Sequence, residues 1–188
     1  MSLEFNRRSF LKYSAAAAVA VAGSSLLVGC GEDEYQKTGK IGSTLKLMGA
    51  FTLESAKLNT APSIAAADKI LTCKFNLKGT SKLGLPIGPA NFQVEVTSKD
   101  SKTVKTYHAY NTDGTGHVSL SKNDNYLEKD ESLETELKVE NISVADGATI
   151  KVMFWPRPQA SEGTQAYTRA FCTWKMTVYE KDGALSLK

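Results

Sequence analysis

Apolar and polar residues alternate with a period of two through most of the chain after position 44. In residues 133–140, Leu133, Leu137 and Val139 share every second position with a threonine, and glutamates and a lysine lie between them. A period of two places successive side chains on opposite faces of a strand, whereas helical spacing would spread these charges around a cylinder. The pattern therefore predicts strands with one buried and one solvent-exposed face.

The same alternation recurs in several segments of similar length. We expect strands at residues 45–53, 71–77, 92–97, 133–140, 150–154 and 172–178. Two more are expected around the loop at 111–116, one before it and one after it. Clusters rich in Asp, Gly and Ser separate these segments, and Asp and Gly supply the backbone angles that tight turns require. About eight short strands with this spacing predict an all-β fold, an antiparallel two-sheet sandwich.

The first 30 residues have a different composition. Arg7 and Arg8 are followed by Ser9-Phe10-Leu11-Lys12, and no charged residue occurs from Tyr13 to Gly29. This segment resembles the twin-arginine export signal, from which it departs only in having Asn6 where Ser or Thr is usual. The resemblance implies that Arg7, Arg8, Phe10, Leu11 and Lys12 direct export, and the segment is therefore excluded from the fold.

The sequence Leu27-Val28-Gly29-Cys30 resembles the lipobox of bacterial lipoproteins. The resemblance implies cleavage before Cys30 and attachment of a fatty acid, such as palmitate, to its thiol. The mature protein would then be anchored to the bacterial cell membrane on its extracytoplasmic side. The alternative is an uncleaved signal anchor, but residues 14–28 are shorter than the ~20 residues that span a bilayer comfortably.

These features define three segments. Residues 1–29 are the signal peptide, 30–43 a flexible tether, and 44–188 the sandwich domain. The tether is polar and contains three consecutive acids, and its lack of alternation argues against the alternative of an ordered first strand. The sandwich resembles the immunoglobulin-like domains of secreted bacterial lipoproteins, although it lacks the Cys–Trp–Cys spacing of true immunoglobulin domains.

The charge balance argues against nucleic acid as a partner. The chain has 23 basic and 20 acidic residues, but three of the basic residues and one acid precede Cys30. The mature chain therefore keeps 20 basic and 19 acidic residues, and its lysines are scattered rather than gathered in a stripe.

Cys73 and Cys172 are the two cysteines of the predicted domain, and both fall on the inward positions of their strands. In an oxidising compartment two such cysteines are candidates for a disulfide. Two unpaired core thiols, or a redox or metal role, remain as alternatives. The absence of a Cys-x-x-Cys motif argues against thioredoxin-type chemistry.

His108 and His117 are the only histidines, and they flank the loop at 111–116. If the two strands form a hairpin, the two imidazoles lie one diagonal step apart on one face. They could then share a metal ion, with Asp113 or Asp124 as a further ligand. The alternative is that both are ordinary polar surface residues.

Trp155 and Arg157 lie at the end of the strand predicted at 150–154, within Trp-Pro-Arg-Pro. Trp155 falls in the outward phase, and an exposed Trp next to an Arg could form a contact patch because these residues dominate binding hot spots. The alternative, which we favour, is that Trp155 covers the edge of the sandwich.

The sequence contains none of the common catalytic signatures, such as Gly-x-Ser-x-Gly, His-Glu-x-x-His, or a phosphate- or dinucleotide-binding glycine motif. We therefore expect no enzyme, and no cofactor beyond the lipid on Cys30. The first hypothesis is a membrane-anchored binding or accessory module for a protein or glycan. The second is a metal-handling or redox-associated lipoprotein that uses His108 and His117.

Overall fold

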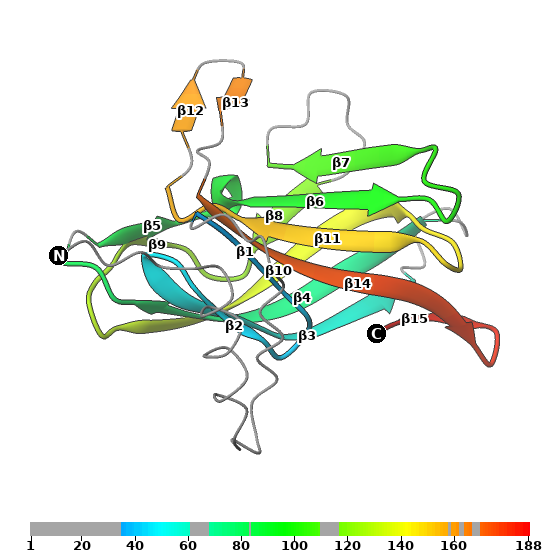
Figure 1. Cartoon of the computed structure of the whole chain (residues 1–188), viewed down its shortest axis with the longest axis horizontal. Coiled ribbons are helices and arrows are strands. Elements are labelled where there is room, and N and C mark those ends of the chain that lie inside the picture. Colours follow the sequence, from blue (N-terminus) through cyan, green and yellow to red (C-terminus); the bar gives the residue numbers. More distant parts are fainter. Residues whose placement is uncertain are drawn as a thin grey trace, which may run out of the picture. The chain divides into compact units, whose positions relative to one another are not determined.

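Strands and turns make up nearly all of the computed structural model, which describes residues 35–60, 68–82, 84–109, 117–157, 159–161, 164–166 and 170–188 (Figure 1). The twin-arginine segment and Cys30 lie outside these residues. Within the described part of the chain, no helix has the length and apolar character needed to cross a bilayer. The prediction of an all-β sandwich is confirmed.

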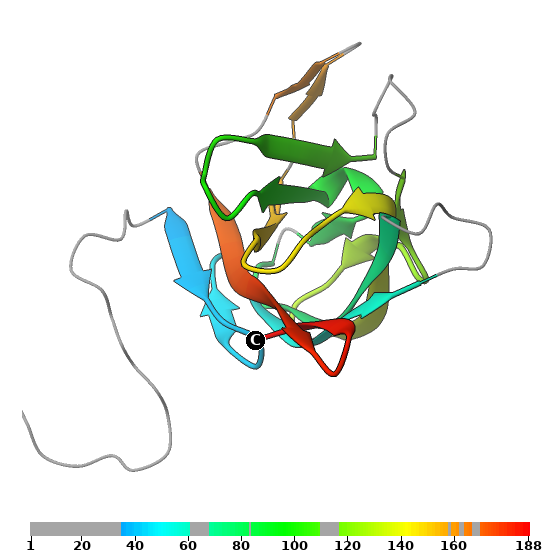
Figure 2. The same ribbon diagram turned by 90° about the vertical axis from the view of Figure 1, so that its right-hand side faces the viewer.

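Two large sheets form the sandwich. In one, the order is β1 (Gln36–Gly39), β14 (Phe171–Lys181), β11 (Thr149–Phe154), β6 (Phe92–Thr97) and β7 (Val104–His108), and β15 (Ala184–Leu187) also pairs with β14. In the other, the order is β2 (Thr44–Lys46), β3 (Gly49–Asn59), β4 (Asp68–Gly79), β10 (Ser132–Ser143) and β8 (His117–Leu120). Figure 2 shows the two sheets end-on, enclosing the core.

Smaller elements lie at the margins of these sheets. β5 (Leu85–Ile87) pairs with β9 (Asp124–Leu127), and β12 (Gln159–Ser161) pairs with β13 (Thr164–Ala166). A single 3-10 turn, η1 (Pro89–Asn91), precedes β6 and is the one helical element that the described residues contain. The described residues thus contain more strands than the sequence predicts, because short edge strands lack a readable alternation.

The core is built from the inward positions that alternation predicts. Along β4 and β6 the buried residues recur at every second position. β10 keeps this period up to the bulge after Val139, and β11 and β14 keep it except where 152–154 and 172–174 are buried on both faces. Large rings fill the space between the sheets: Phe75 packs on Phe92 at 5.2 Å and on Trp174 at 5.3 Å between ring centroids. Phe51 packs on Phe154 at 4.6 Å.

The predicted strand 45–53 is interrupted by a tight turn. Met48 has a φ of 57°, and the Leu47 N–H donates to the Gly49 carbonyl at 2.9 Å. The chain therefore reverses, and β2 pairs antiparallel with β3. The alternation survives because Leu45 and Phe51 lie opposite each other on the buried face.

The tether predicted at residues 30–43 is shorter than expected. Residues 36–39 form β1, which pairs in parallel with β14 and places Gln36 opposite Phe171. Residues 40–43 form a turn in which the Gly42 N–H donates to the Leu53 carbonyl at 2.7 Å. The assignment of 36–43 to a flexible tether is therefore wrong, because pairing with a strand distant in the sequence orders a segment that has no amphipathic pattern.

We expect Phe75→Ala to lower the free energy of unfolding by about 3–5 kcal/mol, the usual cost of removing a buried Phe ring and leaving a cavity. Phe75 is 1% exposed and contacts two other rings across the sandwich. Tyr126→Ala is the matched control, because Tyr126 is 69% exposed. Denaturant titration measures both variants, and equal losses would contradict this view of the core.

Candidate functional site

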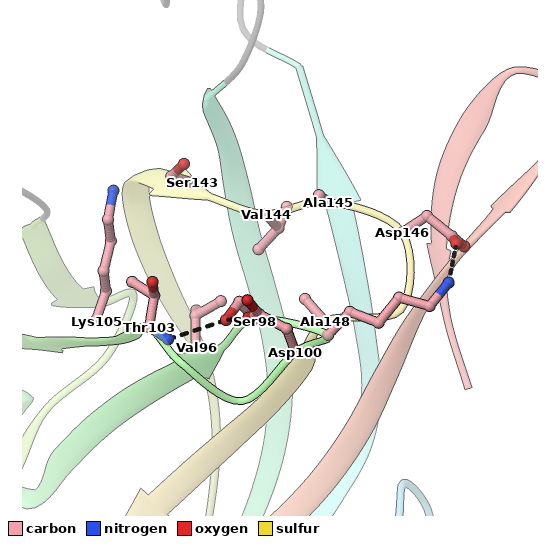
Figure 3. Close-up of a pocket in the computed structure, with 11 residues that line it drawn as sticks. Val96, Ser98, Asp100, Thr103, Lys105, Ser143, Val144, Ala145, Asp146 and Ala148 are labelled. Atoms are coloured by element: carbon pink, nitrogen blue, oxygen red, sulfur yellow. Dashed lines mark hydrogen bonds and ion pairs between the residues drawn. The ribbon is translucent and has the colours of Figure 1, made fainter.

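Three connections meet at one end of the sandwich, here called the loop end: residues 98–103 between β6 and β7, 144–148 between β10 and β11, and 182–183 between β14 and β15. Figures 1 and 2 show these turns gathered at the same end. Between the first two turns lies an open hollow of about 720 Å³, the loop-end hollow (Figure 3).

The floor of the loop-end hollow is aliphatic and its rim is polar. Val96 and Ala148 are buried beneath it, and Val144 and Ala145 line its side. Hydroxyl groups and charges complete the lining: Ser98, Lys99, Asp100, Thr103, Lys105, Ser143 and Asp146. No aromatic residue is among the described residues that line it.

The β6–β7 turn is held by its own side chains. The Ser98 hydroxyl donates to Asp100 Oδ1 at 2.6 Å, and the Lys102 N–H donates to the same oxygen at 3.2 Å. The Thr103 N–H donates to Ser98 Oγ at 3.0 Å. The hydrogen bond from Ser98, followed by that from Lys102, holds the pKa of the Asp100 carboxyl below its ordinary value.

Asp146 joins its own turn to the β6–β7 turn and to the end of β14. The Glu180 N–H donates to Asp146 Oδ1 at 3.1 Å, and Lys99 Nζ lies 3.4 Å from Oδ2. The pKa of the Asp146 carboxyl is lowered, first by the Glu180 N–H and then by Lys99. Next to it, Gly147 has a φ of 79°, and a Cβ there would lie 2.6 Å from Lys99 Cδ. The turn therefore favours glycine for its backbone angle, and a larger residue would also displace the exposed Lys99 side chain.

The start of the 143–148 connection is fixed as well. The Ser143 N–H donates to the phenol oxygen of the buried Tyr107 at 3.2 Å, which joins β10 of one sheet to β7 of the other. A second hollow of about 440 Å³ lies on the other side of the same connection and shares Val144, Ala145 and Asp146 with the first. The connection is thus a fixed wall between two hollows.

The charges around the loop-end hollow are unevenly matched. Lys99 pairs with Asp146 at 3.4 Å, and Lys102 lies 4.0 Å from Asp100. Lys105 forms no ion pair with any residue that the structure describes. In the β6–β7 ladder Lys105 lies opposite the buried Val96, so both side chains are on the same face of the sheet, but Lys105 is exposed. Figure 3 shows Lys105 rising along one side of the hollow, with Asp146 at the other.

The predicted hairpin between His108 and His117 does not form. His108 ends β7 and lies opposite Gln93 in one sheet, whereas His117 begins β8 and lies opposite Glu140 in the other. The prediction fails because β7 and β8 belong to different sheets, a choice that local alternation does not encode. Asp113 lies outside the described residues.

The other proposed metal ligand has a structural role. The Asp124 carboxylate accepts the Tyr126 N–H at 2.8 Å within β9, which pairs with β5 rather than with β7 or β8. Among the described residues, no group of three or more His, Cys, Asp or Glu side chains is placed to hold a metal ion.

Trp155 is not the exposed half of a contact patch. It is 4% exposed and packs on Phe171 with 5.2 Å between ring centroids, while Arg157 is exposed. The buried Asn91 holds the same segment: its carbonyl accepts the Trp155 N–H, and its side-chain amide donates to the Trp155 carbonyl, each at 2.8 Å. Alternation predicts an outward Trp155, but the strand ends at Phe154, so the alternation does not extend to this residue. The packing of Trp155 agrees with the favoured alternative of a Trp that covers the edge of the sandwich.

Cys73 and Cys172 are both buried, and the structure has them as thiols rather than as a disulfide. Cys73 lies in β4 of one sheet and Cys172 in β14 of the other, each at an inward position of its strand. The inward phase of both residues is as predicted, but the structure does not contain the disulfide.

Comparison with known proteins identifies the N-terminal segment. A family model described as the TAT (twin-arginine translocation) pathway signal sequence matches residues 4–24, which confirms the predicted signal. No curated protein matches the chain. The chain therefore belongs to the class of exported proteins, with a twin-arginine signal ahead of an all-β sandwich.

Two solved structures resemble the domain weakly. One is YcdA from Bacillus subtilis subsp. subtilis str. 168, provisionally described as a lipoprotein, with 15% identity and a TM-score of 0.45 over 74% of this chain and 39% of that one. The other is the archaellum periplasmic stator protein FlaG from Sulfolobus acidocaldarius, with 8% identity and a TM-score of 0.38 over 68% of this chain and 98% of that one. Neither likeness is strong enough to transfer a function.

We expect Cys73 and Cys172 to be present as thiols, not joined in a disulfide, in the exported protein. Unfolding in denaturant with an alkylating agent and no reductant should modify Cys73 and Cys172 together, and a reductant should leave the melting temperature unchanged. In the folded state Cys73 should react slowly, because burial and, to a lesser extent, the Glu136 carboxylate raise the pKa of its thiol. Cysteines that become alkylated only after reduction would show instead that Cys73 and Cys172 form a disulfide.

We expect Asp146→Asn to destabilise the domain at neutral pH and to have little effect in acid. A carboxyl whose pKa is lowered by folding contributes stability above its unfolded pKa of about 4, and this contribution disappears as the pH falls through the folded value. The gap in melting temperature between wild type and variant should therefore narrow as the pH falls below about 4 and close once the folded carboxyl is protonated. Asp130→Asn controls for the loss of one charge, and a gap that does not change with pH would contradict the assignment.

Proposed function

We propose that this protein is a lipid-anchored, extracytoplasmic binding module that does not catalyse a reaction. The observation that carries the proposal is the position of Cys30. It closes the sequence Leu27-Val28-Gly29-Cys30, directly after the confirmed twin-arginine signal and only six residues before β1 begins at Gln36.

The lipid would provide the attachment to the membrane. A single acyl chain gives marginal, reversible membrane binding, whereas two or more chains hold a protein stably at about 0.8 kcal/mol per buried methylene. Acylation of both the Cys30 thiol and the amino group exposed by cleavage supplies that second chain. The anchor would then begin at the first residue of the mature protein.

The position of β1 supports a defined orientation on the membrane. Gln36 lies opposite Phe171, the first residue of β14, and the loop end lies at the opposite end of that strand. Six residues span at most about 20 Å, whereas the 11 residues of β14 extend for about 35 Å. A lipid on Cys30 would therefore keep the start of β1 near the bilayer and direct the loop end away from it, toward a partner or ligand.

Two features favour binding over catalysis. The chain has only two histidines, and they belong to edge strands of different sheets, so a paired acid–base or metal site on one hairpin is not available. The loop end instead offers a preformed hollow on a rigid scaffold, the usual location of binding residues in sandwich domains. The metal-handling alternative depended on the hairpin, and no observed contact favours it.

We expect Cys30→Ala to release the mature domain from the membrane fraction or to leave the precursor unprocessed. The wild type should fractionate with membranes and incorporate a palmitate analogue. The matched control is Cys73→Ala, which removes a buried thiol outside the signal and should leave membrane attachment unchanged. Wild-type protein that takes up no palmitate analogue, together with a Cys30→Ala form that stays membrane-bound, would refute the anchor.

A further inference from the structure

We propose that the loop-end hollow binds an aliphatic carboxylate, with its carbon chain on Val96, Val144 and Ala148 and its carboxylate facing Lys105. This inference rests on the proposed function in one respect only, that the protein is a binding module. It adds the location of the site and the chemical class of the ligand.

The lining selects for an aliphatic group. The floor consists of small or branched apolar side chains, and the described lining has no aromatic ring on which a sugar or a nucleobase could stack. The volume of about 720 Å³ lies within the range of small-molecule sites. A flexible hydrocarbon chain can follow such a floor and gains from burying its own surface there.

The charge selects for an anion. Asp146 accepts hydrogen bonds from the Glu180 N–H and Lys99, and Asp100 accepts them from Ser98 and the Lys102 N–H, so both acids already have partners. Lys105 lies opposite Val96 on the edge strand β7, is exposed at the rim of the hollow, and has no carboxylate partner among the described residues. A ligand carboxylate would supply the missing negative charge, and the hydroxyls of Thr103 and Ser143 line the same hollow.

The walls are fixed before any ligand arrives. The Ser143 N–H is bonded to Tyr107 at one end of the 143–148 connection. At the other end, the Gly147 N–H donates to the Val178 carbonyl at 2.9 Å, and the Val178 N–H donates to the Ala148 carbonyl at 2.8 Å. A site whose walls need no ordering loses less conformational entropy on binding.

The test uses the soluble domain, residues 32–188, which forms a compact unit of its own. Octanoate and its neutral amide are titrated separately by calorimetry, and amide NMR shifts locate the binding site. We expect saturable octanoate binding with shifts confined to residues 96–105 and 143–148, and roughly fivefold weaker binding of octanamide.

Three substitutions separate the two parts of the site. Lys105→Glu should weaken octanoate binding roughly fivefold to tenfold, whereas Lys105→Arg should retain it. Val144→Asp should abolish octanoate binding, because it places a carboxylate beside the aliphatic floor. Lys175→Glu is the matched control, because Lys175 is an exposed lysine of β14 that does not line the hollow, and its affinity should equal that of the wild type.

The proposal is wrong if octanoate does not bind saturably or if octanoate and octanamide bind equally well. It is also wrong if Lys105→Glu leaves the affinity unchanged. In that case Lys105 would only protect the edge of the sheet. The soluble domain lacks Cys30, so its titration does not depend on the lipid anchor. A negative octanoate titration would therefore not affect the membrane fractionation result, and a negative fractionation result would not affect the titration.

Discussion

The packing of large aromatic rings between the two sheets is the interaction on which the rest of the structure depends. Phe51 and Phe75 project from one sheet onto Phe92, Phe154 and Trp174 of the other, with ring centroids 4.6–5.3 Å apart for the contacts between sheets. Each ring buries a large apolar area, at about 25 cal/mol for each Å² removed from water. These contacts also join residues that are far apart in the sequence and so hold the two sheets together.

β14 runs between the two ends of the domain. Its first residues pair with β1, the first described strand in the sequence, and its last residues pair with β15. Beyond the ladder, its backbone at Val178 and Glu180 holds the turn of Gly147 and Asp146. A strand that is fixed at both ends keeps a nearly constant separation between the start of β1 and the loop end.

The loop end combines a stable structure with an unmatched charge. The turns around the hollow satisfy their polar groups with each other, through Asp100, Asp146 and Tyr107. Lys105 differs because it is exposed at the edge of the hollow and has no carboxylate partner in the described structure. The proposed aliphatic carboxylate would supply that partner.

The sequence by itself determined the export signal, the all-β class and the buried face of the principal strands, because motif spacing and period-two alternation are local properties of the chain. It could also identify Asp146-Gly147 as a turn. Only the tertiary structure decided which strands pair, because pairing depends on residues far apart in the sequence. This is why residues 36–39 became a strand, why His108 and His117 entered different sheets, and why Trp155 became buried. The loop-end hollow has the same origin, since its walls come from turns that are about 45 residues apart in the chain and meet only after both sheets have formed.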